Sequence, residues 1–357
     1  MSESVLVTGA FGLVGTATLN ALVAEGHQVV ATDLDTPANR RAARKSNGRV
    51  EVRWVNLTDH SATHALVRNV SPAAIIHLAA VIPPFCYRDR ALARRVNVDA
   101  TAALIRAAEA LRPAPRFIQA SSVAVYGARN PHRVADLLTA DTAVDPFDNY
   151  GGHKVEVESL LAKSDLDWVV LRLGGVTPAE VDFGMDNDML YFQGVLPIDN
   201  RIHTVDVRDV GSAFAAAISA KSSREVLLIG GDDTHRLRQG DLVPAVTAVI
   251  GLERLLPTGL RGDPTDDSAW FATDWMDCTR AQSLLGYQQR SWPAVLAELR
   301  ERAGWKRPFL RMAAPLARLY LGHNGVLQRS PGCYAQPWEM ILSKWGAYAP
   351  DAPRASS

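Results

Sequence analysis

The stretch "VTGAFGLVG" (residues 7–15) decides the fold of this chain. It places Gly9, Gly12 and Gly15 between an apolar, strand-like run (4–9) and a segment with helical spacing. Glycine at such a turn permits unusual backbone angles and lets backbone N–H groups approach a phosphate at the positive end of a helix. A strand, a glycine turn and a helix in this order predict a dinucleotide-binding unit.

Apolar runs alternate with helical patterns through the first half of the chain. Strand-like runs follow at 27–33, 49–57, 73–80, 116–122 and 166–174, with helical patterns at 61–70 and 91–113. Continuous apolar strands that alternate with helices indicate a parallel sheet covered on both faces. We therefore expect an α/β fold, a Rossmann-type doubly wound parallel sheet with a smaller C-terminal substrate lobe.

The alternation breaks at Gly174, returns over 201–230, and gives way to a mostly helical, tryptophan-rich remainder. These changes predict three parts. The first is an NAD-binding core of 1–173 plus 201–230. The second is a substrate-binding lobe of 174–200 plus 231–345, and the third is a flexible tail of 346–357.

Composition excludes several classes of partner. Of 357 residues, 47% are hydrophobic and 21% are charged, as in ordinary globular proteins. The 38 Lys and Arg balance the 38 Asp and Glu, so the chain has no net positive charge that would attract nucleic acid. The cysteines Cys86, Cys278 and Cys333 match no metal or disulfide spacing, so we expect no metal. With no secretory signal and no apolar run of about 18 residues, we expect a cytoplasmic protein with no nucleic-acid partner.

The segment 305–322, "WKRPFLRMAAPLARLYLG", is apolar with interspersed arginines. It suits contact with a membrane surface or a partner, or packing onto the small lobe. Pro315 interrupts the long amphipathic pattern. We therefore favour packing onto the small lobe and regard membrane association as unlikely.

Asp33 ends the second strand, 18 residues after Gly15. A carboxylate there accepts hydrogen bonds from a ribose 2′-hydroxyl and repels a 2′-phosphate, which favours NAD over NADP. Arg40, Arg41 and Arg44 nearby keep NADP as the alternative.

Tyr150 and Lys154 lie one helical turn apart in "DNYGGHKVE" (148–156). A lysine ammonium on the same helix face lowers the pKa of a tyrosine hydroxyl, so the pair suits proton transfer. Ser122, at the end of the fifth strand, suits a hydrogen bond to a substrate oxygen. We expect His153, between the pair, to be a helix-surface residue.

The motifs "TGAFGLVG", "HLAA", "SSVAVYG" and Tyr-x-x-x-Lys occur together over about residues 4–230. In order and spacing the chain resembles the extended short-chain dehydrogenase/reductase family, of the NAD-dependent epimerase/dehydratase type. The resemblance implies Tyr150 as the acid/base, Lys154 as its helper and Ser122 as the catalytic Ser/Thr. Besides Gly9, Gly12, Gly15, Asp33, Tyr150 and Lys154, it implies cofactor contacts from Phe11, Leu13, Val14, Asn56, Leu57, Leu78, Ala79 and Ala80.

That family includes dehydrogenases, epimerases and dehydratases. Val123 and Ala124 stand where dehydratases of the family carry acidic residues, which disfavours dehydration. We expect substrate contacts from Pro83, Phe85, Ser122, Val123 and Gly175. The apolar residues of the segments 81–90 and 186–194 indicate an apolar pocket if these segments face the substrate, and the alternative is that they pack the small lobe.

The function that we predict is NAD-dependent hydride transfer at a hydroxyl/keto carbon of a largely apolar small molecule, with Tyr150 as acid/base. The alternative is a sugar-nucleotide epimerase that uses transient oxidation. A third hypothesis is a cofactor-sensing protein without turnover. A homodimer is typical of the family.

Overall fold

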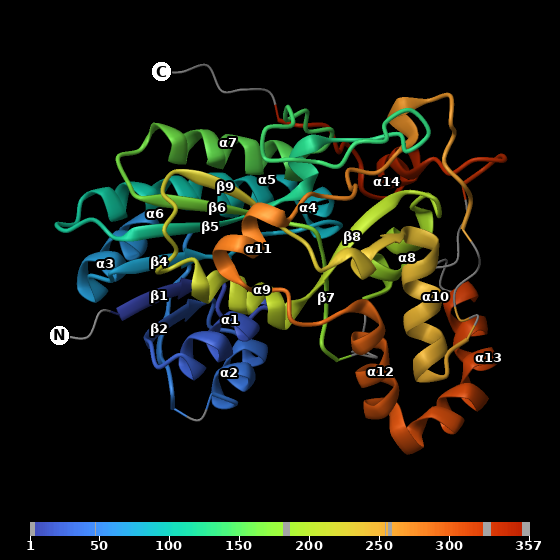
Figure 1. The fold of residues 1–357 in the computed structure, drawn as a ribbon, viewed down its shortest axis with the longest axis horizontal. Helices are drawn as coiled ribbons and strands as arrows, with labels where there is room; N and C mark the ends of the chain where they lie inside the picture. Colours follow the sequence, from blue (N-terminus) through green and yellow to red (C-terminus); the bar gives the residue numbers. More distant parts are fainter. Residues whose placement is uncertain are drawn as a thin grey trace.

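A seven-stranded parallel sheet, in the order β3-β2-β1-β4-β5-β6-β9, forms the core of the structure (Figure 1). Its strands are β1 (Ser4–Thr8), β2 (Gln28–Asp33), β3 (Glu51–Trp54), β4 (Ala74–His77), β5 (Arg116–Ser122), β6 (Trp168–Leu173) and β9 (Glu225–Ile229). The computed structural model describes residues 4–46, 48–180, 186–253, 255, 259–323 and 330–351. The order reverses between β1 and β4, so ligands are expected at the carboxyl ends of these two strands. The predicted Rossmann-type fold is confirmed.

Alternating side chains explain why the sheet is buried on both faces. Val5 and Val7 pack into one apolar cluster, and Leu6 between them packs into another. Helices α1 (Leu13–Ala24), α9 (Val207–Ala216) and α11 (Thr279–Leu285) contribute to the first cluster, and α3 (His60–Val70), α6 (Ala100–Glu109) and α7 (Asn149–Lys163) to the second. Because both faces are covered, each strand reads as a continuous apolar run.

The smaller lobe contains a second sheet in the order β10-β8-β7 and most of the later helices. Its elements are β7 (Gly175–Thr177), β8 (Arg201–Asp206), β10 (Arg236–Arg238), α8 (Asn187–Val195), α10 (Gln239–Ile250), α12 (Trp292–Ala303), α13 (Arg307–His323) and α14 (Pro337–Trp345). The remaining helices include α2 (Pro37–Arg44), α4 (Phe85–Arg88) and α5 (Arg90–Arg94).

One predicted boundary needs correction. We assigned 201–230 to the core, but β8 pairs with β7 and β10 in the small sheet. The place beside β6 is taken by β9, which runs parallel to it from Val169 opposite Glu225 onward. Only the later part of 201–230, with α9 and β9, therefore belongs to the main sheet and its helices.

The C-terminal segment also differs from the expectation of a flexible tail over 346–357. Residues 346–351 lie against α7, where Asn149 N donates to Tyr348 O at 2.7 Å and His153 Nε2 donates to Asp351 Oδ2 at 2.9 Å. Arg90 adds an ion pair with Asp351 at 2.7 Å. Residues 352–357, and 181–185 of the predicted lobe, lie outside the described residues.

Candidate active site

Two glycines of the loop between β1 and α1, which we call the glycine loop, have no room for a side chain. A Cβ on Gly9, where φ is +63°, would lie 2.6 Å from Ala79 N, and one on Gly15 would lie 2.1 Å from Gly9 O. Gly12 differs, because a Cβ there would approach no closer than 3.5 Å to Gly9 O, an ordinary van der Waals contact. The loop is thus closed toward the sheet and open at Gly12, which leaves room for a phosphate at the start of α1.

Asp33 closes the far side of this loop. Its Oδ2 accepts from Phe11 N at 3.0 Å, and its Oδ1 accepts from Leu34 N at 2.8 Å. The carboxylate therefore stands beside the loop at the end of β2, where it can also accept a ribose hydroxyl. Arg40 is engaged by Asp35, with Nη2 donating to Oδ2 at 2.6 Å. This arrangement fits NAD better than its phosphorylated form.

The other predicted cofactor residues follow the carboxyl edge of the sheet. Leu78 N donates to Thr8 O at 3.2 Å, so the backbone of Leu78, Ala79 and Ala80 continues beside the glycine loop. Leu13 is 51% exposed at the start of α1, next to the half-buried Val14. Asn56 and Leu57 follow β3, where Asn56 Oδ1 accepts from Thr58 N at 3.1 Å and Leu57 is buried.

Ser122, Tyr150 and Lys154 meet where β5 ends and α7 begins. Asp148 caps α7, since its Oδ1 accepts from Gly151 N at 2.7 Å, and this fixes the first turn that carries Tyr150. The Ser122 side chain lies close enough to the Tyr150 hydroxyl to lower its pKa, and Ser122 Oγ accepts from Ala124 N at 3.2 Å. Lys154 Nζ lies 5.6 Å from the centre of the Tyr150 ring. The structure brings the three predicted residues together.

The protonation states differ from our expectation. Burial raises the pKa of Tyr150, against a smaller lowering by the nearby Ser122 side chain. Burial also lowers the pKa of Lys154 to about 8, and its Nζ donates to Ala120 O at 2.8 Å. The expected lowering of the Tyr150 pKa by Lys154 is therefore wrong for the protein without ligands, because desolvation dominates. Tyr150 holds its proton at neutral pH.

His153 is buried, with 1% of its side chain exposed, and not on the helix surface as expected. Burial lowers its pKa, so the ring is neutral at pH 7. Nε2–H then donates to Asp351, and Nδ1 accepts from Asn97 Nδ2 at 3.4 Å. Asn97, in the π-helix Arg95–Asp99, also bonds both backbone groups of Val81. The sequence offered no signal for this chain of contacts, because Asp351 is 198 residues from His153.

Tyr150 packs against a group of aromatic residues that we call the aromatic cluster. Its members are Tyr87, Phe147, Phe192, Phe271, Trp338 and Tyr348. Trp338 lies at its centre, with ring distances of 5.0 Å to Phe147, 5.3 Å to Phe271 and 4.9 Å to Tyr348. Trp338 and Tyr348 were not among the predicted site residues, because they lie almost 200 residues after Tyr150 in the sequence.

The predicted substrate residues separate into two groups. Ser122 is beside Tyr150, and Pro83 and Phe85 lead into α4, whose Cys86 and Tyr87 pack in the cluster containing the aromatic residues. Val123 packs elsewhere, in a buried cluster with Leu138 and Met276, and Gly175 pairs with Thr204 in the small sheet. The structure does not bring Val123 and Gly175 to the aromatic cluster.

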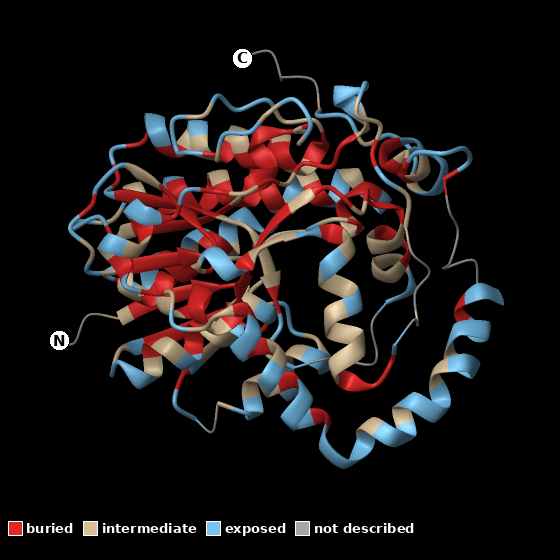
Figure 2. Ribbon diagram, turned by 45° about the vertical axis from the view of Figure 1, so that its right-hand side comes forward, coloured by how far each residue is buried: buried red, intermediate tan, exposed pale blue. Residues whose placement is uncertain are grey.

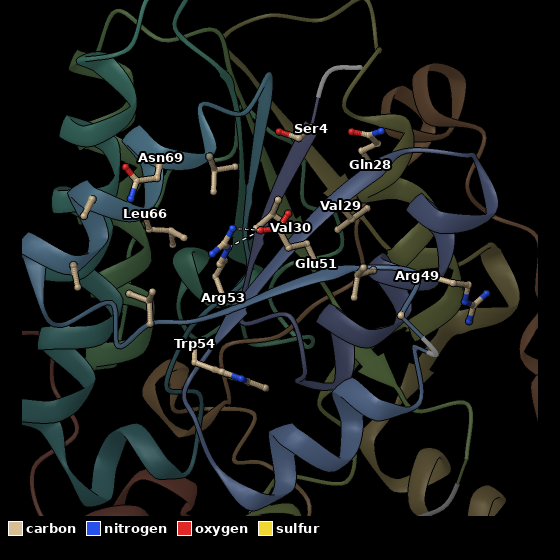
Figure 3. A pocket seen from close by; sticks show the side chains of 16 residues that line it. Ser4, Gln28, Val29, Val30, Arg49, Glu51, Arg53, Trp54, Leu66 and Asn69 are labelled. Carbon is tan, nitrogen blue, oxygen red and sulfur yellow. Dashed lines mark hydrogen bonds and ion pairs between the residues drawn. The ribbon is translucent and has the colours of Figure 1, made fainter. Parts of the chain in front are cut away.

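A cavity of about 760 Å³ lies away from these residues, along β3 and α3 (Figure 3). Ser4 and Gln28, the first residues of β1 and β2, line it, together with Glu51, Arg53 and Asn69. It therefore opens toward the amino ends of these strands, the side opposite the glycine loop, and we do not assign it to the cofactor. Among the described residues, no group of three or more His, Cys, Asp or Glu could hold a metal ion.

Comparisons with known proteins agree with this geometry. The model of the NAD dependent epimerase/dehydratase family matches residues 5–183. D-erythronate dehydrogenase of Cupriavidus necator is 34% identical over 183 residues, which cover 48% of this chain and 54%, about half, of that enzyme. The 3-diazoavenalumate denitrifying reductase of Streptomyces sp is 26% identical over 305 residues, covering 80% of this chain and 95% of the reductase.

A solved structure shares the fold. The Bordetella bronchiseptica enzyme WbmG in complex with NAD superposes with a TM-score of 0.67 at 17% identity, covering 87% of this chain and 97% of that one. No helix in the described part of this chain is both long and apolar enough to cross a membrane.

Proposed function

The chain belongs to the NAD dependent epimerase/dehydratase family, and on that premise we propose that it is an NAD-dependent oxidoreductase. Its substrate is a largely apolar small molecule that carries a hydroxyl or keto group. One observation carries this proposal: Tyr150, which lies beside Ser122, packs against the aromatic cluster. A proton donor set in an apolar surface suits a substrate with one polar oxygen and an apolar body.

The residues at the carboxyl edge of the sheet would hold the cofactor. The glycine loop would bind the pyrophosphate through backbone N–H groups, with its open side at Gly12. Asp33 would accept a ribose hydroxyl, and Lys154 would donate to the nicotinamide ribose. NAD, when bound, supplies the hydride acceptor, or in its reduced form the donor.

Tyr150 and Ser122 would act on the substrate oxygen. Because burial keeps the Tyr150 hydroxyl protonated, it is ready to donate that proton to the oxygen of a carbonyl as the carbon is reduced. Ser122 would orient the oxygen and stabilise the charge that develops on it. In the opposite direction a deprotonated Tyr150 would accept the proton of the substrate hydroxyl.

The aromatic cluster would select the substrate. Its buried rings exclude water beside Tyr150 and offer little to a substrate with many hydroxyls. The Streptomyces relative is named a reductase and the Cupriavidus relative a dehydrogenase, and both names describe net oxidation or reduction. These names support a net redox reaction over a transient one.

The family's name supports the second candidate, a sugar-nucleotide epimerase. An epimerase returns the hydride to the same substrate, so it gives no net change in NADH. A cofactor-sensing protein, the third hypothesis, would bind NAD and convert nothing.

One assay separates the three. The purified chain is incubated with NADH and a set of apolar aryl and alkyl ketones, and NADH absorbance is followed beside product by chromatography. We expect NADH to be consumed in equal amount to the alcohol formed, faster for apolar ketones than for a polyhydroxy ketone. Turnover of a nucleotide sugar without net NADH change, or NADH binding with no conversion of any substrate, would contradict the proposal.

A further inference from the structure

Residues 346–351, which we call the strap, cross the first half of α7. They are exposed or half-buried, and Figure 2 shows this end of the chain on the outer side of the molecule. Tyr348 O accepts from Asn149 N, one of the first-turn groups that have no partner within the helix. The strap lies so close that a Cβ on Gly152 would be 3.1 Å from Pro350 Cβ. The strap therefore contacts the same turns of α7 that carry the proposed acid/base.

The Asp351 carboxylate joins three side chains from two helices. Its Oδ2 accepts from His153 Nε2 at 2.9 Å, and its Oδ1 accepts from Arg90 Nη2 at 2.7 Å. Arg94 Nη1 lies 3.5 Å from Oδ2. Burial raises the pKa of Asp351, but the contacts with His153 and Arg90 outweigh it, so the pKa lies below its usual value. A charged carboxylate thus joins α5, which carries both arginines, to α7.

The two arginines hold this link in one orientation. Arg90 also donates to the strap backbone, from Nη1 to Ala347 O at 2.8 Å and from Nη2 to Ala349 O at 2.9 Å. Arg94 also pairs with Glu156 of α7, with Nη2 donating to Oε1 at 2.8 Å and Nη1 to Oε2 at 3.0 Å. Because each guanidinium makes several bonds at once, its position is fixed more firmly than a single ion pair would fix it.

The link acts on the two sides of the candidate active site. His153 directly precedes Lys154 and follows Tyr150 by three residues, so the three move together on one rigid helix. Helix α5 continues from α4, which follows the predicted substrate residues Pro83 and Phe85. A displacement of about 1 Å between a catalytic group and its substrate can lower a rate about a hundredfold.

We propose that Asp351 is a positioning residue for the reaction at Tyr150. It fixes α7 against α5 and thereby sets where Tyr150 and Lys154 stand. It acts through His153 and contacts neither substrate nor cofactor. This inference rests on the proposed function for its effect on turnover, whereas its effect on α7 and on NADH binding can be measured without a substrate.

Kinetics of Asp351→Asn test the proposal, because this variant keeps the size of the side chain and removes its charge. For a ketone that the wild type reduces, we expect kcat to fall roughly tenfold. The Kd for NADH should rise roughly threefold, since a displaced Lys154 donates less well to the nicotinamide ribose. Asp351→Glu, which keeps the carboxylate, should recover most of both losses. Circular dichroism at the assay temperature confirms that each variant is folded.

The matched control is Glu298→Gln in the small lobe. Glu298 also joins two arginines, Arg208 at 2.7 Å and Arg302 at 3.9 Å, but it does not contact α7. Its loss should leave kcat and the Kd for NADH unchanged.

A second variant, Arg90→Gln, removes the same link from the side of α5. It should lower kcat as much as Asp351→Asn does, and the double variant should be no slower than either single one, because the two substitutions break one contact. If Asp351→Asn does not fold, Arg90→Gln provides the test.

Hydrogen exchange separates this inference from the proposed function. The amides of 149–156 should exchange roughly tenfold faster in Asp351→Asn than in the wild type. If the wild type reduces no ketone while Asp351→Asn still speeds this exchange and weakens NADH binding, the proposed function fails and the positioning role stands. Wild-type NADH binding in a folded Asp351→Asn variant, with wild-type kcat wherever turnover is measured, would overturn the positioning role. Equal losses in Glu298→Gln would overturn it too.

Discussion

Helices α13 and α14 follow one another in the chain, and the segment of each carries tryptophan among other large apolar residues. Trp338, on α14, is 4% exposed at the centre of the aromatic cluster, and its Nε1 donates to Trp270 O at 3.0 Å. Trp305, just before α13, is 75% exposed. Both segments are rich in large apolar residues, so the difference in burial comes from the elements that each helix contacts. Helix α14 meets rings from α4, α8 and the loop before α7, whereas α13 meets apolar partners on one face.

The same contrast assigns different roles to the two helices. Helix α14 completes the apolar surface against which Tyr150 packs, so we expect its side chains to affect both stability and substrate selection. Helix α13 turns Phe309, Met312 and Leu316 outward, so we expect these exposed side chains to affect neither. Each of the following pairs of substitutions compares a buried or crowded position with an exposed or uncrowded one.

The largest effect on stability is expected at the two tryptophans. Trp338→Ala removes a buried ring with three aromatic neighbours and should lower the free energy of unfolding by about 3–5 kcal/mol. Trp305→Ala should change it by no more than about 0.5 kcal/mol. Urea unfolding of both variants measures this, and equal losses would show that α14 is not the more deeply packed helix.

A buried and an exposed lysine should differ in their pH dependence. Lys154 titrates near pH 8 in the folded protein, because burial lowers its pKa, and near 10.5 in the unfolded chain. Between these values the unfolded chain binds more protons, so stability rises with pH. Relative to Lys154→Met, the wild type should gain roughly 3 kcal/mol from pH 8 to 10.5.

The control for this titration is Lys306→Met, at the exposed start of the α13 segment. Its free energy of unfolding should follow that of the wild type across the same pH range. If the profiles of wild type and Lys154→Met also ran parallel, Lys154 would not be desolvated as described.

The glycine loop contains one glycine without room for a side chain, Gly15, and one with room, Gly12. Gly15→Ala forces a Cβ against Gly9 O and should cost about 1–3 kcal/mol of stability. Gly12→Ala has room and should leave stability nearly unchanged, yet weaken NADH binding about tenfold by obstructing the pyrophosphate. NADH fluorescence titration beside thermal unfolding separates the two, and unchanged binding in Gly12→Ala would place the cofactor elsewhere.

The smallest effect on stability is expected at Asp351, in the segment 346–351 that lies against α7. Asp351→Asn removes the carboxylate that accepts from His153 and pairs with Arg90, and should cost about 1 kcal/mol. Asp233→Asn, which breaks an exposed pair with Arg236, should cost about 0–0.5 kcal/mol. A loss no larger at Asp351 than at Asp233 would mean that the segment 346–351 contributes little to holding α7.

Much of the fold and of the candidate site could be predicted from the sequence, because the patterns that indicate them are local. Short stretches of sequence show the glycine turn, the continuous apolar strands and the one-turn spacing of Tyr150 and Lys154. The order of the strands in the sheet then places Ser122 beside Tyr150 and Lys154. The burial of His153 and Trp338, by contrast, depends on partners far away in the sequence. The pKa of Tyr150 was mispredicted for the same reason, since desolvation comes from the whole packed site.

The exposure of α13 shows what a local sequence pattern does not reveal, which is whether an apolar helix face is covered. The helix packs Leu310 and Ala314 onto the small lobe, and it continues through Pro315, which we expected to interrupt it. Its sequence has the periodicity of a packed helix on two faces, and one of them stays open. Periodicity identifies an apolar face and does not say whether the chain itself provides the surface that covers it.

The most direct test of the account is the Tyr150→Phe variant, assayed for ketone reduction and NADH binding in parallel. Loss of the hydroxyl removes the proton donor and leaves the ring in place. We predict that kcat falls about 10²–10⁴-fold while the Kd for NADH stays within about twofold. Unchanged kcat, or lost NADH binding in a folded variant, would contradict the role assigned to Tyr150.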